Sequence, residues 1–486
     1  MSNLSELLPA GGGGKNVDFV ASGTLGNGVT VALNGDGTVS AVGTSISEAL
    51  GTPAVLFGTP AQIVSTFDTN ENKLVVAYTD GDNSNFGTAV VGTVSGSTIS
   101  FGTPVVFEGN GAVGQTAVTF DSTNNKVVIA YSDASNSDYG TAVVGTVSGT
   151  SISFGTKVVF EAASIIYTSA VFDSANNKVV IFYTDTGNSN YGTAIVGTVS
   201  GTSISFGTPV IFLSGYAIGN GSAYDVSAEK TLVVYRNFSN QSRGESCVGT
   251  VSGTSISFGT SANFSGPYAL GASLCAYDSV SQKIVVVYSS NESGTQRGWA
   301  VVGTISGTTI SYGTRVNYQS SRVNRLGVGY DTTSDKIVIG YRNRDASDKG
   351  YLIYGTVSGT SISFGSALLL NNEASASHSL VYANSVSKMV VTSFLETSVD
   401  AQSVTYQPPY SIANTNFIGI SDAAIADTAS GSVTIKGGLK SGLSSLTPNS
   451  IYYTQADGSV TTASTAPAVR IGKALSSTTL NLEFSS

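Results

Sequence analysis

A repeat of about 52 residues is the feature that most constrains the fold of this chain. The segment VGTVSG recurs with small changes, and its copies begin at Val91, Val144, Val196, Val248, Val302 and Tyr354. An Ile that precedes a Gly-Thr or Gly-Ser step recurs with the same period, at Ile46, Ile99, Ile152, Ile204, Ile256, Ile310 and Ile362. Self-similarity at a fixed period of this length is typical of propellers and other repeat folds.

Each repeat contains four runs that read as β-strands. In the second copy these are Thr116–Phe120, Lys126–Tyr131, Gly140–Val147 and Ser151–Phe160, which are rich in β-branched and aromatic residues and separated by Gly, Asn, Asp and Ser. The run KVVIAY is continuously apolar, which predicts a strand that is buried on both faces. Four antiparallel strands repeated seven times predict an all-β fold, a seven-bladed β-propeller. A β-solenoid is the alternative, but its repeats are usually shorter.

The ends of the repeat array predict how the ring closes. A copy of the fourth strand, Ser45–Phe57, precedes the first complete repeat. The last repeat has only three strands, near Ser379–Tyr382, Lys388–Phe394 and Ala401–Tyr406. The N-terminal strand can therefore complete the seventh blade and remove the open edges of the ring.

These boundaries divide the chain into three predicted parts. Residues 43–407 form the propeller, and Gln407-Pro408-Pro409 marks its end. Residues 1–42 form an N-terminal arm with a flexible Gly tetrad and a β-hairpin around the turn NGDG. Residues 408–486 form a small β-sandwich-like domain.

Recurring Asp residues have a structural interpretation. An Asp stands five residues before a Lys in six repeats, where turn capping with a weak ion pair is expected, at Asp68, Asp121, Asp173, Asp225, Asp278 and Asp331. A second motif, D-x-x-N-S-[ND]-aromatic-Gly, begins at Asp80, Asp133 and Asp185. An Asx-type turn explains it better than a metal site, since the Gly and the distal Glu of a calcium loop are absent.

Composition excludes several classes of function. Lys and Arg number 22 against 31 Asp and Glu, so the net charge of −9 argues against nucleic-acid binding. No apolar run reaches 18 residues, so no membrane span is expected. His378 is the only His, and Cys247 and Cys275 have no metal-binding spacing, so we expect buried thiols, no metal, no cofactor and no enzyme activity. The N-terminus lacks the pattern of a signal peptide, which predicts synthesis in a cytoplasm.

One face of the propeller varies between blades. The turns between strands one and two and between strands three and four are nearly uniform, while the loops on the opposite face differ from blade to blade. Divergent loops on a uniform scaffold are free to specialise. In blades one to three they carry acidic residues, namely Asp80, Asp82, Glu108, Asp133, Asp138, Glu161 and Asp185. In blades four to six they carry basic residues, namely Arg236, Arg243, Arg297, Arg322, Arg325, Arg342 and Arg344.

Aromatic residues accompany the basic sector and suggest a ligand site. Aromatic rings beside guanidinium groups can hold sugar rings and acidic substituents. The candidate ligand-binding residues are Tyr216, Arg236, Arg243, Tyr268, Arg297, Trp299, Arg344 and Tyr351. The competing interpretation is a solvated polar rim whose aromatic rings pack on neighbouring loops.

The two ends of the chain resemble known proteins. The opening LLPAGGGGKNVDFVASGTLGNGVTVALNGDGTV and the closing segments FIGISDAAIADTASGSVTIKGG, LTPNSIYYTQADGSVTT and IGKALSSTTLNL resemble structural fibre and tail proteins of marine tailed bacteriophages, including cyanophages. The central repeats are similar to propeller regions in those proteins. The resemblance implies a virion protein, often trimeric, that contacts the host surface.

Three hypotheses on function follow. The first is a phage fibre or tail protein, made in the host cytoplasm and released by lysis in the virion. Its terminal regions would attach it to other virion proteins and oligomerise it as a homotrimer, and its variable face would bind a host glycan or protein receptor. The second is a purely structural virion component that docks other virion proteins. The third is a secreted adhesin or a polysaccharide-degrading enzyme.

Overall fold

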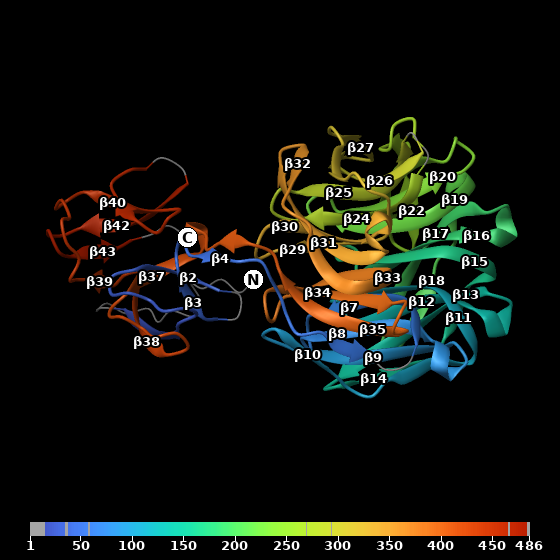
Figure 1. The fold of residues 1–486 in the computed structure, drawn as a ribbon, viewed down its shortest axis with the longest axis horizontal. Helices are drawn as coiled ribbons and strands as arrows, with labels where there is room; N and C mark the ends of the chain where they lie inside the picture. Colours follow the sequence, from blue (N-terminus) through green and yellow to red (C-terminus); the bar gives the residue numbers. More distant parts are fainter. Residues whose placement is uncertain are drawn as a thin grey trace. The chain divides into compact units, whose positions relative to one another are not determined.

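A computed structural model describes residues 15–34, 37–56, 59–268, 270–292, 294–464 and 467–483. The Gly tetrad and the two central residues of NGDG lie outside these residues. The chain forms two compact units, one of residues 49–408 and one that combines residues 1–48 with residues 409–486 (Figure 1). The larger unit is the propeller.

Within the described residues, seven antiparallel blades make up the propeller. Their first strands contact one another around the ring and are β7 (Pro60–Asp68), β11 (Val105–Asp121), β15 (Val158–Asp173), β19 (Val210–Asp225), β24 (Leu270–Asp278), β29 (Val323–Asp331) and β33 (Leu368–Ala383). The second strands are β8 (Lys73–Asp80), β12 (Lys126–Asp133), β16 (Lys178–Asp185), β20 (Lys230–Asn237), β25 (Lys283–Glu292), β30 (Lys336–Asn343) and β34 (Lys388–Leu395). The third strands are β9 (Phe86–Ser95), β13 (Tyr139–Ser148), β17 (Tyr191–Ser200), β21 (Arg243–Ser252), β26 (Thr295–Ser306), β31 (Lys349–Ser358) and β35 (Asp400–Gln407).

The fourth, outer strand of each blade is split into two segments. The sequence pattern predicts one continuous strand here. The first segment is β10 (Thr98–Phe101), β14 (Ser151–Phe154), β18 (Ser203–Phe206), β22 (Ser255–Phe258), β27 (Thr309–Tyr312) or β32 (Ser361–Phe364). A short break follows at a Phe/Tyr-Gly step. The second segment is β23 (Ala262–Asn263), β28 (Val316–Gln319) or the start of β11, β15, β19 or β33, and it pairs with the same third strand.

The predicted closure of the ring is confirmed by strand pairing. In the seventh blade, β35 pairs antiparallel with β5 (Ala49–Leu50) and β6 (Ala54–Leu56). Across the same junction, Ser65 N and Oγ contact Ser379 Oγ at 2.9 and 2.8 Å and so join the first strands of blades one and seven. The segment before the first repeat therefore supplies the outer strand that the last repeat lacks.

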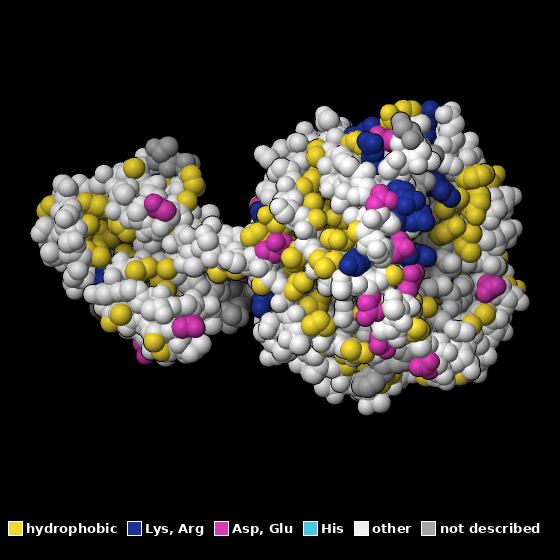
Figure 2. Space-filling view, viewed as in Figure 1, with side chains coloured by type: hydrophobic (Ala, Val, Ile, Leu, Met, Phe, Trp, Pro, Cys, Tyr) yellow, Lys and Arg dark blue, Asp and Glu magenta, His cyan; other side chains and the backbone are white. Residues whose placement is uncertain are grey.

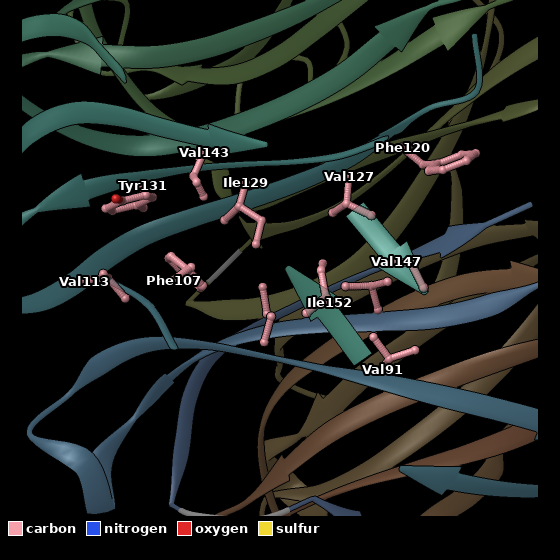
Figure 3. Close-up of a cluster of buried hydrophobic side chains, with 13 residues drawn as sticks. Val91, Phe107, Val113, Phe120, Val127, Ile129, Tyr131, Val143, Val147 and Ile152 are labelled. Atoms are coloured by element: carbon pink, nitrogen blue, oxygen red, sulfur yellow. The ribbon is translucent and has the colours of Figure 1, made fainter. Parts of the chain in front are cut away.

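The core lies between neighbouring blades. Figure 3 shows one such cluster, in which Val91 of blade one lies beside Val147 and Ile152 of blade two. All five residues from Val127 to Tyr131 are fully buried, as the apolar run predicts. Because β12 is covered by a blade on each side, both of its faces are apolar.

The repeated Asp residues cap the turns between first and second strands. Asp121 Oδ1 accepts hydrogen bonds from the backbone N–H groups of Thr123 and Asn124, and the Asp of five other repeats does the same. The turn capping is thus confirmed. The ion pair is not: among the described residues, no salt bridge joins these Asp and Lys side chains, and Lys73 Nζ donates to Thr93 Oγ1 instead.

One of these caps has an incomplete set of partners. In the second repeat, Asp121 Oδ2 accepts a hydrogen bond from Asn124 Nδ2 at 2.9 Å. Asp331 Oδ2 is buried and has no hydrogen-bond partner within the described part of the chain, and Ser334 stands where Asn124 does. Burial raises the pKa of Asp331 from 3.8 to about 6. The carboxylate form of Asp331 is therefore poorly stabilised in the folded protein.

We expect Asp331→Asn to stabilise the protein at neutral pH. The raised pKa means that the folded protein holds the proton more tightly, so this carboxyl's contribution to stability is present at low pH and is lost as the pH rises through about 6. Asn keeps an acceptor oxygen without the charge, so the free energy of unfolding should rise by roughly 2 kcal/mol at pH 7.5 and little at pH 4. Urea unfolding at both pH values measures this difference.

Asp121→Asn is the matched control. Asp121 Oδ2 accepts a hydrogen bond from Asn124 Nδ2, and the NH₂ group of the new Asn would place a second donor against it. The substitution should destabilise the protein at pH 7.5 by about 1 kcal/mol. Equal effects of the two substitutions would contradict the assigned role of the unpartnered oxygen.

The loops between second and third strands share one conformation in four blades. A short 3₁₀ helix forms there as η2 (Gly81–Asn83), η3 (Ala134–Asn136), η4 (Thr186–Asn188) and η5 (Arg344–Ala346). The preceding Asp or Asn side chain caps it, as when Asp133 accepts from the N–H of Ser135. The Asx-type interpretation of this motif is therefore confirmed. Blade five differs, since β25 and β26 extend further and form a tight hairpin.

The second unit corrects the prediction of a separate N-terminal arm. Its first sheet has the order β1-β38-β37-β2-β3 and so mixes both ends of the chain. Its strands are β1 (Asn16–Val20), β2 (Thr30–Leu33), β3 (Val39–Ala41), β37 (Phe417–Ser421) and β38 (Ser430–Ile435). The hairpin of β2 and β3 is confirmed, but it packs its apolar side against C-terminal residues such as Ile418 and Val433, because two short strands alone cannot bury a core.

A second sheet completes this unit. Its strands are β39 (Leu439–Lys440), β40 (Ile451–Gln455), β41 (Val460–Thr461), β42 (Ala468–Ala474) and β43 (Leu480–Leu482). Phe417 and Ile420 of the first sheet pack against Tyr452 and Ile471 of the second, in a sandwich-like arrangement. A short ladder of β4 (Ser45–Ile46) and β36 (Tyr410–Ser411) and the 3₁₀ helix η6 (Asn414–Asn416) also belong to this unit.

Candidate functional site

The two faces of the propeller differ as the sequence predicts. Because all strands in a blade are antiparallel, the uniform turns lie on one face and the variable loops on the other. On the surface that Figure 2 shows, Lys and Arg side chains gather in the upper part of the propeller, near β20, β24 and β26, and Asp and Glu side chains lie mainly below. We call the face with the variable loops the variable face.

The acidic sector is less exposed than the sequence suggests. Glu108 is only 1% exposed and accepts hydrogen bonds from Tyr131 and Lys157. Asp133 is 2% exposed and lies within 3.4 Å of Lys157 Nζ. These two carboxylates serve the junctions between blades. The acidic surface of the variable face is therefore weaker than a count of residues indicates.

A β-bulge interrupts the first strand of every blade near the variable face. The register shifts near the same end of all seven first strands, at the same position in five of them and slightly displaced in β24 and β33. The residue in the left-handed region at this bulge is Gln62, Gln115, Tyr167, Gly219 or Arg325 in five blades. Bulges often re-aim side chains next to binding sites. Neighbouring bulges are linked, since Gln115 Oε1 accepts from the N–H of Tyr167 at 2.8 Å.

The candidates Tyr216 and Arg236 lie together in blade four. The ring of Tyr216 contacts Phe238, with centroids 5.7 Å apart. The bulged Tyr167 lies near Tyr216 and Arg236, and burial together with the neighbouring Tyr216 raises the pKa of Tyr167. Phe238 is 57% exposed on the variable face. Sequence reasoning missed it, although its position in a divergent loop was a usable signal.

The candidates Tyr268 and Trp299 form a different group, organised by Arg315. The guanidinium of Arg315 lies 4.2 Å from the ring centroid of Trp299 and 4.7 Å from that of Tyr268. It also forms a salt bridge with Glu292 at the end of β25. These are cation–π contacts, which stabilise the loop packing of blade five. Sequence reasoning missed Arg315, since no local sequence pattern indicates which Arg will contact these two rings.

The remaining candidates do not converge on one point. Tyr351 stacks on Tyr341 with an interplanar angle of 19° and packs against the core. Arg243 donates to Gln241. Arg297 is half-buried, and its Nε has no hydrogen-bond partner among the described residues. Arg344 lies 4.0 Å from Asp348 and is 45% exposed.

A pit of about 430 Å³ brings two of the candidates together. We call this cavity the arginine pit. Arg236 and Arg344 line it with Arg322, from blades four and six, and blade five contributes polar residues of its hairpin and the start of β24. Its volume lies at the small end of the range for ligand sites, roughly 300–1,000 Å³. The arginine pit is the candidate binding site of the variable face.

The His and Cys side chains of the propeller are buried and have structural surroundings. His378 is buried, its Nδ1 lies 3.0 Å from Ser393 Oγ, and burial lowers its pKa to about 4, which keeps the imidazole neutral. Cys247 and Cys275 are buried free thiols, as predicted. Among the described residues, no cluster of His, Cys, Asp and Glu could hold a metal ion, and no helix is long and apolar enough to cross a membrane.

The strand pairing defines the chain as a closed seven-bladed β-propeller with a smaller all-β unit. No family model and no curated protein matches the sequence. Among solved structures, the chain is similar to the Dos1 propeller, with 11% sequence identity and a TM-score of 0.42 over 81% of this chain and 95% of that chain. A similarity at this level carries no argument about function.

Proposed function

We propose that this protein is a phage fibre or tail protein that binds a glycan on the host surface through the variable face of its propeller. The observation that carries the proposal is the exposed Phe238, which lies against Tyr216 and follows Arg236 of the arginine pit by two residues. An exposed apolar ring on the same face as a polar cavity suits a sugar, whose apolar ring face stacks while its hydroxyl groups find polar partners. The resemblance of both chain ends to phage structural proteins supports the setting of the proposal.

A homotrimer and attachment to other virion proteins belong to the same proposal. Several copies of a weak site on one particle would raise the overall avidity without new contacts. The mass of the purified protein by light scattering tests the trimer, and a monomeric mass would contradict it.

A purely structural virion component is the second candidate function. The separation of charge across the variable face favours it, because complementary charged surfaces steer and orient protein partners. Cryo-electron microscopy of the virion separates the two candidates, since a structural component would have this face covered by a neighbouring subunit.

We expect Phe238→Ala to weaken binding of the full-length protein to its target in an array of bacterial surface glycans. Loss of one stacked ring corresponds to about three- to tenfold in affinity. Titration of the variant and the unsubstituted protein against the glycan bound on the array measures the change.

Val280→Ala is the control for this substitution. Val280 is 64% exposed, similar to Phe238, but it lies in a uniform turn on the opposite face. It should leave the affinity unchanged. Equal losses for the two variants would contradict the site, and an array without any specific hit for the folded protein would contradict glycan binding itself.

A further inference from the structure

One wall of the arginine pit is formed by the hairpin between β25 and β26 of blade five. The other blades with a described loop at this place have the capped 3₁₀ helix or a short turn, whereas blade five extends β25 and β26 into a hairpin. Asn291 and Gln296 of this hairpin line the pit. The cavity therefore arises from the one loop that departs most from the repeat, which is where specialisation is expected.

The charge inside the pit is positive. None of the described residues that line it is acidic. Arg322 forms a salt bridge with Asp345 at 2.7 Å, and Arg344 lies 4.0 Å from Asp348, so carboxylates beside the pit offset these two cations in part. Arg236 has no ion pair among the described residues. One guanidinium is thus left without a counter-charge.

The geometry of Arg236 leaves much of its hydrogen-bonding capacity unused. Its Nη1 donates to the backbone carbonyl of Leu270 at 3.1 Å, which holds the side chain in place. Its Nε is buried and has no hydrogen-bond partner among the described residues. A guanidinium carries five N–H donors in a planar fork that matches the two oxygens of a carboxylate or sulfate.

One neutral polar group in the pit, the amide of Gln296, is also held in position. Gln296 Nε2 lies 3.3 Å from Ser289 Oγ. A Cβ on Gly271 would lie 1.8 Å from Gln296 Nε2, so this glycine allows the amide to pack against the start of β24. Orienting the amide before a ligand arrives reduces the entropy lost on binding. A fixed amide is suited to the hydroxyl groups of a sugar.

We propose that the arginine pit binds an anionic sugar residue, with Arg236 holding its carboxylate or sulfate group and Asn291 and Gln296 holding its hydroxyl groups. This inference rests on the proposed function and names the class of glycan. It predicts a preference for acidic polysaccharides over neutral ones, although the protein itself has a net charge of −9.

The test uses three polymers as probes for the full-length protein. Polygalacturonate supplies carboxylates, dextran sulfate supplies sulfates, and unmodified dextran is the neutral reference. Binding is measured at a fixed ionic strength of about 0.15 M, where long-range attraction between exposed charges is largely screened. We expect one of the two acidic polymers to bind and dextran not to bind. The polymer that binds identifies the anionic group.

Variants locate the interaction within the basic sector. Arg236→Gln should lower the affinity for the acidic polymer about tenfold, while Arg243→Gln, the same charge change outside the pit lining, should change it less than twofold. Arg236→Lys should lie between them, because it keeps the charge without the fork. Equal losses for Arg236→Gln and Arg243→Gln would overturn the site in favour of diffuse electrostatic attraction. Unfolding midpoints of all variants show whether each is folded, and Arg344→Gln, at an exposed position of the pit, replaces Arg236→Gln if that variant is not folded.

The outcomes for this inference and for the proposed function are distinguishable. Specific binding to neutral glycans on the array, together with no binding to either acidic polymer, would overturn the anionic sugar and leave glycan binding standing. No binding to any glycan by the folded protein would overturn both.

Discussion

Gly155→Ala is expected to destabilise the propeller by about 3 kcal/mol or more. Gly155 lies at the break between β14 and β15, and a Cβ at this position would lie 1.8 Å from the carbonyl oxygen of Thr202. That oxygen belongs to the backbone of the turn between the third and fourth strands of the next blade, so it cannot move aside without moving the turn. Overpacking against a rigid neighbour costs 1–3 kcal/mol and occasionally more. Urea unfolding measures the loss.

The same close contact recurs between other neighbouring blades, so we expect a similar loss of stability from Ala at each equivalent glycine. At the equivalent glycines, an added Cβ would lie within 2.0 Å of the carbonyl oxygen of a Thr in the next blade. These glycines are Gly102, Gly207, Gly259 and Gly313. Gly149→Ala is the matched control. Gly149 has φ of +61° and no atom within 4 Å of an added Cβ, so only backbone strain of about 1 kcal/mol is expected. Similar losses for the two substitutions would show that close approach of the blades is not the reason.

Lys157→Met should have the second large effect, a loss of about 3 kcal/mol. Lys157 Nζ contacts the buried carboxylate of Glu108 and lies 3.4 Å from Asp133 Oδ2. Burial lowers the pKa of Lys157, but the hydrogen bond and charge of Glu108 outweigh it and hold the pKa above its ordinary value. Removing one partner of a buried pair leaves an uncompensated charge, which costs 3–5 kcal/mol when the site is fully buried. Lys157 is 37% exposed, so we expect the lower end.

A double-mutant cycle tests the origin of this loss. Glu108→Gln in the Lys157→Met background should recover part of the stability, because the amide oxygen can still accept from the hydroxyl group of Tyr131 without leaving a buried charge. A double variant as unstable as the sum of the two single variants would contradict a direct interaction of Lys157 with Glu108.

The architecture of the propeller could be predicted from the sequence because its information is local and repeated. The apolar run Val127–Tyr131 and the Asp turns each indicate part of the structure of one blade, and they recur around the ring. The extra strand before the first repeat indicates how the ring closes.

The pairing of the two chain ends could not be predicted in this way. Residue 31 pairs with residue 419, and no local pattern marks a partner almost 400 positions away. The same limit applies to the candidate site. The sequence placed aromatic and basic residues on one face, but whether Arg315 or a ligand contacts Trp299 depends on rotamers and on the path of the blade-five hairpin. Divergence from the repeat was the useful signal, since both Phe238 and the hairpin lie where it is greatest.

The closure of the ring by β5 and β6 has a consequence for how such proteins can change. The chain enters the propeller at Ala49 and leaves it after Gln407, and these two residues are neighbours in one sheet. Ile46 and Tyr410, just outside, are paired in the smaller unit. The whole ring is therefore a cassette inserted into a small β fold through two adjacent strands. A different cassette whose ends emerge side by side could replace it without disturbing the smaller unit, so recombination could exchange the whole propeller in a single event.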